Sequence, residues 1–337
     1  MPENAIVADE LVKVYRGRGR RPEVRALDGL SLTVPAGRVF GLLGPNGAGK
    51  STTTKILTTL SRATTGGASV DGHDVRRAPD AVRAAIGYVS QGASTDPVLT
   101  ALENLEIAGR LRGISARAAG ARAAQLLEEF GLAEASRRPV STFSGGMRRR
   151  LDVAAALVHR PRVLFLDEPT TGLDPEARAA MWAEIRRLSG EEALTVVLTT
   201  HYMEEADRLA DEILLVNRGR AVVQGTPGQL KAALHGDSVR VSLIEPEPAA
   251  VRAAIARVPG LRDVVVEASG VDGVLAARTD DASAAVGAVI AALDAAGIRY
   301  GQVAASHPTL DDVYLHFVGH TFDDAAPALA TSTGAAA

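Results

Sequence analysis

The chain has 337 residues, of which 46% are hydrophobic and 23% charged, and this length and balance are typical of a globular protein of about two domains. It contains no cysteine and carries a formal net charge of -3, which excludes disulfides and thiolate metal sites and gives no electrostatic reason to expect nucleic acid as a partner. The sequence has neither a basic-then-apolar signal pattern nor an apolar run near the roughly 20 residues that cross a bilayer, so we expect a cytosolic protein.

Two strands are predicted in the first 35 residues. Residues 6–15 carry β-branched side chains and end at Tyr15, and residues 30–34 alternate apolar and polar side chains as a half-buried strand does. The segment 16–22 between them is rich in glycine and arginine. It predicts an exposed loop, and a solvated turn is a simpler interpretation of it than a contact patch.

Residues 44–51, GPNGAGKS, match the pattern G-x-x-x-x-G-K-[ST] of a phosphate-binding loop. Residues 39–43 before it are apolar enough for a buried strand, and residues 51–57 after it can open a helix. Glycines let the backbone wrap an anion, and the helix N-terminus adds a positive dipole end. We expect Lys50 to reach the β- and γ-phosphates and the Ser51 hydroxyl to ligate Mg²⁺.

The alternative for this segment is a glycine-rich turn with a chance lysine. The complete match in a strand–loop–helix context favours binding of a nucleoside triphosphate instead. The candidate nucleotide-binding residues of the loop are Gly44, Pro45, Asn46, Gly47, Ala48, Gly49, Lys50, Ser51 and Thr52.

A helical subdomain over about residues 93–160 is predicted between two strand-rich halves. Residues 68–75 indicate a short strand with an Asp-Gly turn, and 86–91 a strand that finishes on Gln91. The pattern then turns helical from 100 to 137, with apolar side chains spaced for two buried faces. The residues expected on those faces are Leu102, Leu105, Ala108, Leu111, Leu126, Leu127, Phe130 and Leu132.

The subdomain ends with Ser144, Gly145 and Gly146, directly before a helix pattern over 148–158. A serine and two glycines at a helix start suggest a second anion-binding helix N-terminus.

Asp167 and Glu168 follow the apolar run 163–166, which is typical of a central parallel strand. Ligands in open parallel sheets bind at the carboxyl ends of the strands. Asp167 there suits a partner of Mg²⁺, and Glu168 can orient or deprotonate the attacking water. We expect Gln91 and His201, each at a strand end, to sense the γ-phosphate and the metal. Either residue alone is as well explained by a satisfied structural hydrogen bond.

The last third of the chain predicts a smaller domain. Residues 212–216 and 220–224 flank a glycine-containing turn and indicate a hairpin, and Thr226 caps the next helix. Residues 237–320 then follow the order β-α-β-β-α-β, which is the ferredoxin-like arrangement. The final residues, 321–337, have the composition of a disordered tail.

Taken together, these motifs resemble those of the nucleotide-binding subunit of an ABC transporter over residues 5 to about 236. The matching segments are 44–51 (Walker A), Gln91 (Q-loop), 143–147 (signature), 163–168 (Walker B), 172–174 (D-loop) and His201 (switch histidine). The expected fold is therefore α/β, a P-loop NTPase domain over 1–236 followed by the small α+β domain. The resemblance also implies that Tyr15 stacks on adenine and that Asp174 lies near the nucleotide.

The resemblance further implies how the subunit works with its partners. ATP and Mg²⁺ are the expected ligands, with Ser51, Gln91 and Asp167 near the metal and Glu168, Gln91 and His201 catalytic. Two copies would pack head to tail, so that Ser144, Gly145 and Gly146 of one face the ATP held by the other. A separate polytopic membrane subunit is implied, with this chain at the cytoplasmic face of the membrane.

A more specific resemblance, to daunorubicin- and doxorubicin-resistance exporters, depends on residues 143–152 and 309–315 and on the small C-terminal domain. It implies outward transport of a drug- or antibiotic-like hydrophobic compound. Export of a polysaccharide, lipid or ion is an alternative, and a soluble ABC ATPase without a transport role is another. The role of residues 237–320 and the effect of Met147, where the commoner signature has glutamine, stay open.

Overall fold

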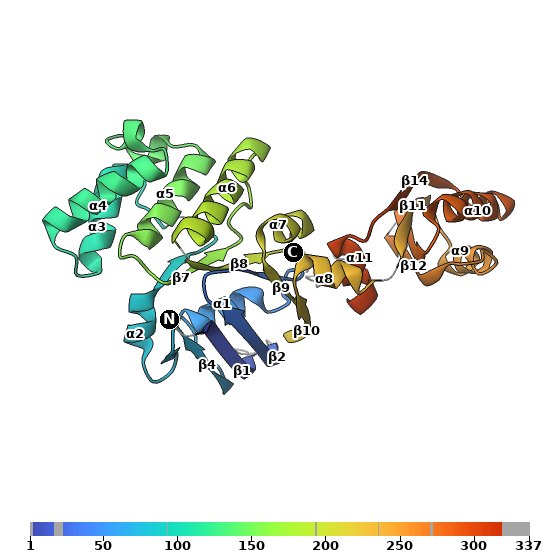
Figure 1. Ribbon diagram of the computed structural model, residues 1–337, viewed down its shortest axis with the longest axis horizontal. Coiled ribbons are helices and arrows are strands. Elements are labelled where there is room, and N and C mark those ends of the chain that lie inside the picture. Colours follow the sequence, from blue (N-terminus) through green and yellow to red (C-terminus); the bar gives the residue numbers. More distant parts are fainter. Residues whose placement is uncertain are drawn as a thin grey trace, which may run out of the picture. The chain divides into compact units, whose positions relative to one another are not determined.

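The protein is described by a computed structural model that covers residues 3–16, 23–92, 94–192, 194–234, 236–269 and 272–318 (Figure 1). Contacts between Cα atoms divide the chain into two units. The first comprises residues 1–44 and 48–224, and the second comprises 225–337 together with the short segment 45–47. Most of the basic loop 16–22 and the whole of the predicted tail 321–337 lie outside the described residues.

A six-stranded sheet forms the centre of the first unit, in the order β10-β9-β3-β8-β7-β6. Its strands are β3 (Val39–Leu43), β6 (Ile86–Val89), β7 (Val163–Asp167), β8 (Thr195–Thr200), β9 (Glu212–Asn217) and β10 (Arg220–Gly225). The strands from β9 to β6 run parallel. Every residue of β3, β7 and β8 is buried, as expected for parallel strands covered on both faces. The carboxyl ends of these strands therefore share one edge.

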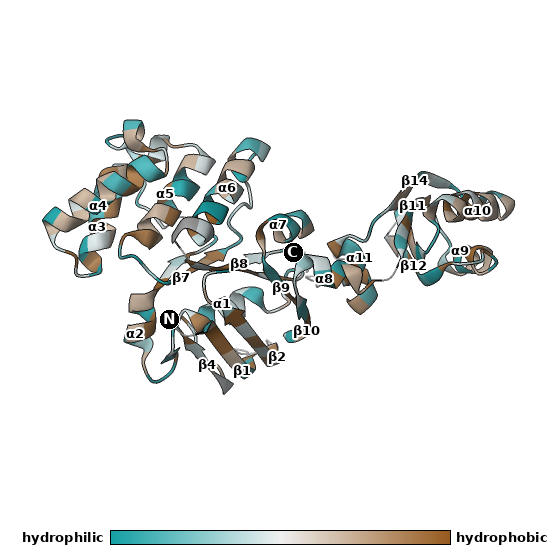
Figure 2. Ribbon diagram, in the orientation of Figure 1, coloured by the Kyte–Doolittle hydropathy of each residue, from teal (hydrophilic) through white to brown (hydrophobic). Residues whose placement is uncertain are grey.

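A second, antiparallel sheet has the order β2-β1-β4-β5. Its strands are β1 (Asn4–Tyr15), β2 (Val24–Pro35), β4 (Thr65–Val70) and β5 (His73–Asp74). The strand predicted at 30–34 is thus only the end of β2, which pairs with β1 from Val24 opposite Tyr15 to Pro35 opposite Asn4. One hydrophobic cluster joins this sheet to helix α1 (Lys50–Leu57) and to the central sheet. Figure 2 shows hydrophobic stretches along β1 and β2.

The predicted helical stretch 100–137 is two helices, α3 (Ala101–Leu111) and α4 (Ala116–Glu129), followed by two 3-10 turns, Ala133–Ala135 and Val140–Thr142. Thr100 and Glu103 form a capping box at the start of α3, and Ser115 caps α4. Leu126 and Leu127 are buried as predicted, whereas Leu111 is 82% exposed. The prediction for Leu111 was wrong because α3 ends at that residue and leaves its side chain outside the packed face.

Four further helices belong to the first unit: α2 (Pro79–Ala85), α5 (Gly145–Leu157), α6 (Pro175–Glu192) and α7 (Met203–Leu209). The sequence predicted α5 and α6 but neither α2 nor α7. Each of these two has 7 residues, which is too short for a clear 3.6-residue period. Only local signals mark them, such as Pro79 at the first position of α2.

The second unit follows the strand and helix order that the sequence predicts. It begins with α8 (Pro227–Ala232), whose capping box is formed by Thr226 and Gln229. The elements after it are β11 (Asp237–Ile244), α9 (Pro248–Ile255), β12 (Arg262–Ser269), β13 (Asp272–Thr279), α10 (Ala282–Ala295), β14 (Tyr300–Ser306) and α11 (Leu310–Val318). The strands form one antiparallel sheet, β12-β13-β11-β14, with its own hydrophobic core.

Candidate functional site

The phosphate loop connects β3 to α1, and its backbone requires glycine. Gly47 and Gly49 have φ angles of 81° and 113°, a region that side-chain-bearing residues rarely adopt. A Cβ on Gly44 would lie 2.2 Å from the carbonyl oxygen of Val216, and one on Gly49 would lie 2.8 Å from that of Ala26. The N-cap of α1 is Gly49, and the first turn carries no acidic residue. The N–H groups of that turn therefore suit an anion.

Lys50, the first residue of α1, is buried with 4% of its surface exposed. Its Nζ donates a hydrogen bond to the carbonyl oxygen of Gly44. Burial lowers the pKa of Lys50, while the charges of Glu168 and Asp167 oppose that shift. A buried ammonium beside the loop and opposite two carboxylates is well placed to bind a phosphate.

Asp167 ends β7 and links the loop to the sheet. Its Oδ1 accepts hydrogen bonds from Ser51 Oγ at 3.2 Å and from Thr199 Oγ1 at 2.6 Å. Hydroxyl and carboxylate oxygens are the hard donors that Mg²⁺ prefers, so Ser51 and Asp167 fit a magnesium ion chemically. Sequence reasoning missed Thr199, for which the only available signal was its place on a predicted strand two residues before His201.

Glu168, the next residue, brings the predicted catalytic groups together. Its Oε2 accepts a hydrogen bond from Gln91 Nε2 at 3.0 Å, and its Oε1 lies 3.2 Å from His201 Nδ1. We call Lys50, Ser51, Gln91, Asp167, Glu168 and His201 the strand-end cluster. Gln91 was predicted to finish its strand, but β6 ends at Val89. The extra two residues let Gln91 extend from the sheet edge to Glu168.

The backbone of Glu168 is strained, with a φ angle of 47°. This conformation costs a residue with a side chain about 1–2 kcal/mol. Its N–H donates to the carbonyl oxygen and to Oγ1 of Thr199, both at 3.1 Å. These hydrogen bonds to β8 thus stabilise a backbone conformation of Glu168 that its local sequence does not favour.

Two further residues predicted to bind the nucleotide, Tyr15 and Asp174, make contacts outside the strand-end cluster. Tyr15, at the end of β1, is 42% exposed, and Lys13 Nζ lies 4.9 Å from the centre of its ring. Asp174 precedes α6, and its Oδ1 accepts a hydrogen bond from Ala177 N at 2.8 Å. An exposed aromatic ring is available for stacking, while Asp174 caps its own helix.

The signature residues make contacts with their own helix and with the start of α6. Ser144 is the N-cap of α5, and its Oγ accepts a hydrogen bond from Met147 N at 3.2 Å. A Cβ on Gly145 would lie 3.8 Å from Leu173 Cδ2, and one on Gly146 would lie 2.8 Å from the Cβ of Ala177. Within the described residues, Ser144 and the two glycines thus lie against helix α5 and residues 173–177.

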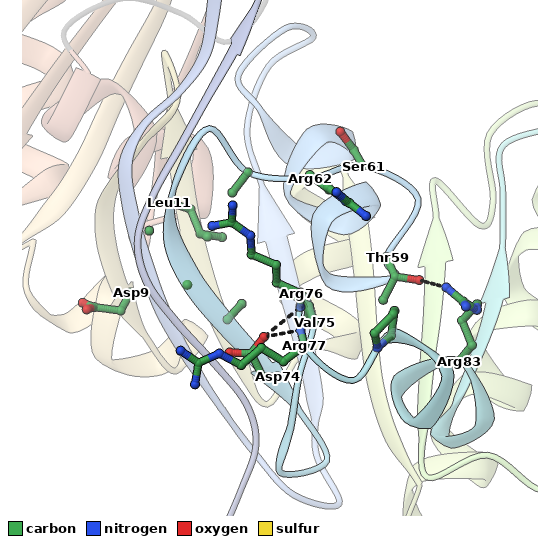
Figure 3. Close-up of a pocket in the computed structure, with 15 residues that line it drawn as sticks. Asp9, Leu11, Thr59, Ser61, Arg62, Asp74, Val75, Arg76, Arg77 and Arg83 are labelled. Carbon is green, nitrogen blue, oxygen red and sulfur yellow. Dashed lines mark hydrogen bonds between the residues drawn. The ribbon is translucent and has the colours of Figure 1, made fainter.

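A cavity of about 820 Å³ lies among β1, β4, the end of α1 and α2 (Figure 3). Four arginines line it, Arg62, Arg76, Arg77 and Arg83, with Asp9 and Asp74. Asp74 Oδ1 accepts hydrogen bonds from the backbone N–H groups of Arg76 and Arg77, both at 2.8 Å. None of the predicted site residues lines this cavity, so its size does not bear on the predicted chemistry.

Comparison with known proteins gives consistent results. Residues 27–171 match the ABC transporter family model. The chain is 47% identical to the daunorubicin resistance ATP-binding protein DrrA3 of Streptomyces coeruleorubidus, over 93% of this chain and 97% of that protein. It is 45% identical to the daunorubicin/doxorubicin resistance ATP-binding protein DrrA of Streptomyces peucetius, over 96% and 95%.

A solved structure of similar fold is the dimeric, post-hydrolysis state of the ATP-binding cassette MJ0796 bound to ADP and Pi. Its TM-score is 0.60 at 26% identity, covering 66% of this chain and 98% of that one. None of the helices in the described part of the chain has both the length and the apolar character of a membrane-spanning segment.

Proposed function

This chain belongs to the ABC transporter family as an ATP-binding, ATP-hydrolysing subunit, and from that premise we propose that it powers export of a drug-like hydrophobic compound through a separate membrane protein. The proposal for the cargo is supported by the two relatives, both described as daunorubicin-type resistance proteins, which align with this chain over nearly their whole length. Polysaccharide, lipid or ion export is the alternative cargo class.

The strand-end cluster is the observation that carries the catalytic part of this proposal. It places an ammonium, a hydroxyl, two carboxylates, an amide and an imidazole at one edge of a parallel sheet, beside a glycine loop. Phosphoryl transfer needs little covalent chemistry from a protein and depends mainly on positioning and charge. The cluster offers both.

In the proposed mechanism, Lys50 and the N–H groups at the start of α1 bind the phosphates of ATP. Ser51 and Asp167 would hold Mg²⁺, which when bound offsets phosphate charge. Glu168 orients the attacking water and accepts its proton. Gln91 and His201 each contact a different oxygen of that carboxylate, so they fix its rotation while the γ-phosphate is attacked.

A second copy of the chain is proposed to complete the site. The signature turn makes its own contacts on α5 and α6 and has exposed Ser144 and Gly145 at a helix N-terminus. That surface suits the γ-phosphate of an ATP bound by another copy. The dimeric state of the cassette MJ0796 supports this arrangement.

The membrane subunit is proposed to dock near residues 91–100 and the helical subdomain, at the cytoplasmic face of the membrane. Val98 in this segment is 80% exposed, and Leu111 at the end of α3 is 82% exposed. Isolated apolar side chains at a surface need no explanation by themselves. The place of Val98 in the segment that follows Gln91 supports a docking role, because movement there would reach Glu168 through the Gln91 hydrogen bond.

Replacement of Lys50 by alanine tests the nucleotide site. We expect Lys50→Ala to abolish ATP retention in a filtration assay, because it removes the only lysine of the loop and its charge. Retention equal to that of the unmodified chain would contradict the assignment of the loop. The cargo is tested separately, by whether the chain and its membrane partner together lower cell accumulation of a fluorescent anthracycline in a Lys50-dependent way.

A further inference from the structure

We propose that Arg149 and Asp152 of helix α5 form a clamp that positions Gln91 and Glu168 for ATP hydrolysis; this inference rests on the proposed function. In the sequence both residues lie in the 143–152 segment, where no local signal indicates their role. They are three positions apart and thus on one face of the helix, with 9% and 4% of their surfaces exposed.

Arg149 binds the backbone on both sides of the Gln91–Glu168 hydrogen bond. Its Nη1 donates to the carbonyl oxygen of Ser90 at 2.7 Å, directly before Gln91. Its Nη2 donates to that of Asp167 at 3.0 Å, and its Nε donates to that of Pro169 at 2.9 Å. The two peptide segments that carry the glutamine and the glutamate are therefore held by one rigid, planar guanidinium.

This contact matters most at Glu168, whose left-handed backbone conformation the local sequence does not favour. The carbonyls of Asp167 and Pro169 lie immediately before and after it in the chain. Arg149 on α5 fixes both of these carbonyls, and the Glu168 N–H is fixed by its hydrogen bonds to Thr199 on β8. Together these contacts restrict the direction in which the Glu168 side chain leaves the backbone. A misdirected carboxylate would be poorly placed to orient water.

Asp152 holds the far end of the Gln91 segment. Its Oδ1 accepts hydrogen bonds from Ser94 N at 3.1 Å and from Thr95 Oγ1 at 3.2 Å. The clamp thus holds the segment at residue 90 and again at residues 94–95, with Gln91 between. Because Ser144 is the N-cap of α5, a shift of the signature helix on pairing with a second copy would be transmitted to both catalytic side chains.

The clamp residues are positioning residues, so their loss should reduce turnover more than ATP affinity. In the full-length chain, Arg149→Lys keeps the charge but offers one nitrogen where three are used. We expect kcat for phosphate release to fall about 10- to 100-fold, with unchanged affinity for trinitrophenyl-ATP. Arg150→Lys is the matched control, since among the described residues the hydrogen bond of Arg150 goes to the carbonyl of Phe130, within the helical subdomain. It should leave kcat near the wild-type value.

Asp152 supplies a second, independent test. Asp152→Asn keeps an acceptor oxygen and should retain turnover, whereas Asp152→Ala removes it and should lower kcat without changing affinity for trinitrophenyl-ATP. In a Glu168→Gln background, Arg149→Lys should produce no further loss, because the residue through which it acts has already been replaced.

Wild-type kcat in Arg149→Lys would overturn the clamp. So would equal losses of kcat and nucleotide affinity, or a lowered melting temperature that accounts for the lost turnover, since these are the effects of a merely structural arginine. A wild-type chain that does not hydrolyse ATP contradicts the proposed function and, with it, this inference. If the wild-type chain hydrolyses ATP and Arg149→Lys hydrolyses it equally fast, only the clamp is contradicted and the proposed function stands.

Discussion

The strand-end cluster and the signature turn both consist of short sequence motifs, but their contacts in the folded chain differ. In the cluster, side chains from α1, the end of β7 and the segments after β6, β7 and β8 contact one another. In the signature turn, Ser144 caps its own helix and the glycines pack against residues 173–177. One chain therefore completes the first group of contacts, whereas the second group leaves the signature surface available to another molecule.

This difference separates binding from turnover. A single chain contains both the groups that we propose hold ATP and those that we propose orient water. Changes in the cluster should therefore alter groups that one copy already brings together, whereas changes in the signature turn should act only where two copies meet. The following three predictions test that separation, from the largest effect to the smallest.

Replacement of Glu168 by glutamine should give the largest effect. Glutamine cannot accept the proton of the attacking water, so we expect ATP turnover to fall by at least about 100-fold. ATP binding should persist, and an ATP-bound dimer should accumulate. Phosphate release and light scattering after size exclusion measure both effects. Hydrolysis by Glu168→Gln at the native rate would remove this residue from its catalytic role.

Replacement of Ser144 by alanine should lower turnover about 10-fold or more, as expected for a lost hydrogen bond to a charged group. ATP affinity of the monomer should not change. The serine also caps a helix, and losing such a cap costs about 1 kcal/mol of stability.

Ser115→Ala is the control for that cost, because Ser115 caps α4 in the same way through Ala118 N. Both variants should melt at similarly lowered temperatures, and only Ser144→Ala should lose turnover. If Ser144→Ala hydrolyses ATP as fast as Ser115→Ala, the signature serine is not part of a composite site.

The smallest effect concerns pH and the helix that carries the signature. Burial raises the pKa of Asp152 despite its hydrogen bonds from Ser94 and Thr95. A raised pKa in the folded state contributes stability below the usual value near 3.8, and this contribution is lost as pH rises through the folded pKa. The melting temperature of the wild type should therefore rise relative to the melting temperature of Asp152→Asn as pH falls from neutrality.

Asp312 in the second unit provides a control of opposite sign. Burial alone would raise its pKa, but hydrogen bonds from Thr309 and the charge of Arg240 outweigh that effect and lower it. Its contribution is present above the usual value and is lost as pH falls through the folded pKa. Wild type should thus lose stability relative to Asp312→Asn in acid. Equal pH dependence in the two pairs would show that neither carboxylate is coupled to folding as inferred.

Local sequence was sufficient for the elements and motifs whose physics is local. The phosphate loop follows from glycine geometry within eight residues, and Thr226 was predicted as a helix cap from its own neighbours. The apolar run before Asp167 predicts a buried strand by composition alone. The order of strands and helices in residues 237–306 could likewise be predicted from the alternation of strand and helix hydrophobic periods along the chain.

Only the tertiary structure decided which of these residues meet. Gln91, Glu168 and His201 come together because β7 lies between β6 and β8 in the sheet, and strand order depends on long-range packing rather than on local periodicity. Long-range packing likewise determines the hydrogen bond from Thr199 to Asp167 and the hydrogen bonds from Arg149 to three backbone carbonyls. A backbone carbonyl is present at every residue, so sequence cannot indicate which of them a buried guanidinium will bind. The fold makes that choice by placing helix α5 against the strand ends.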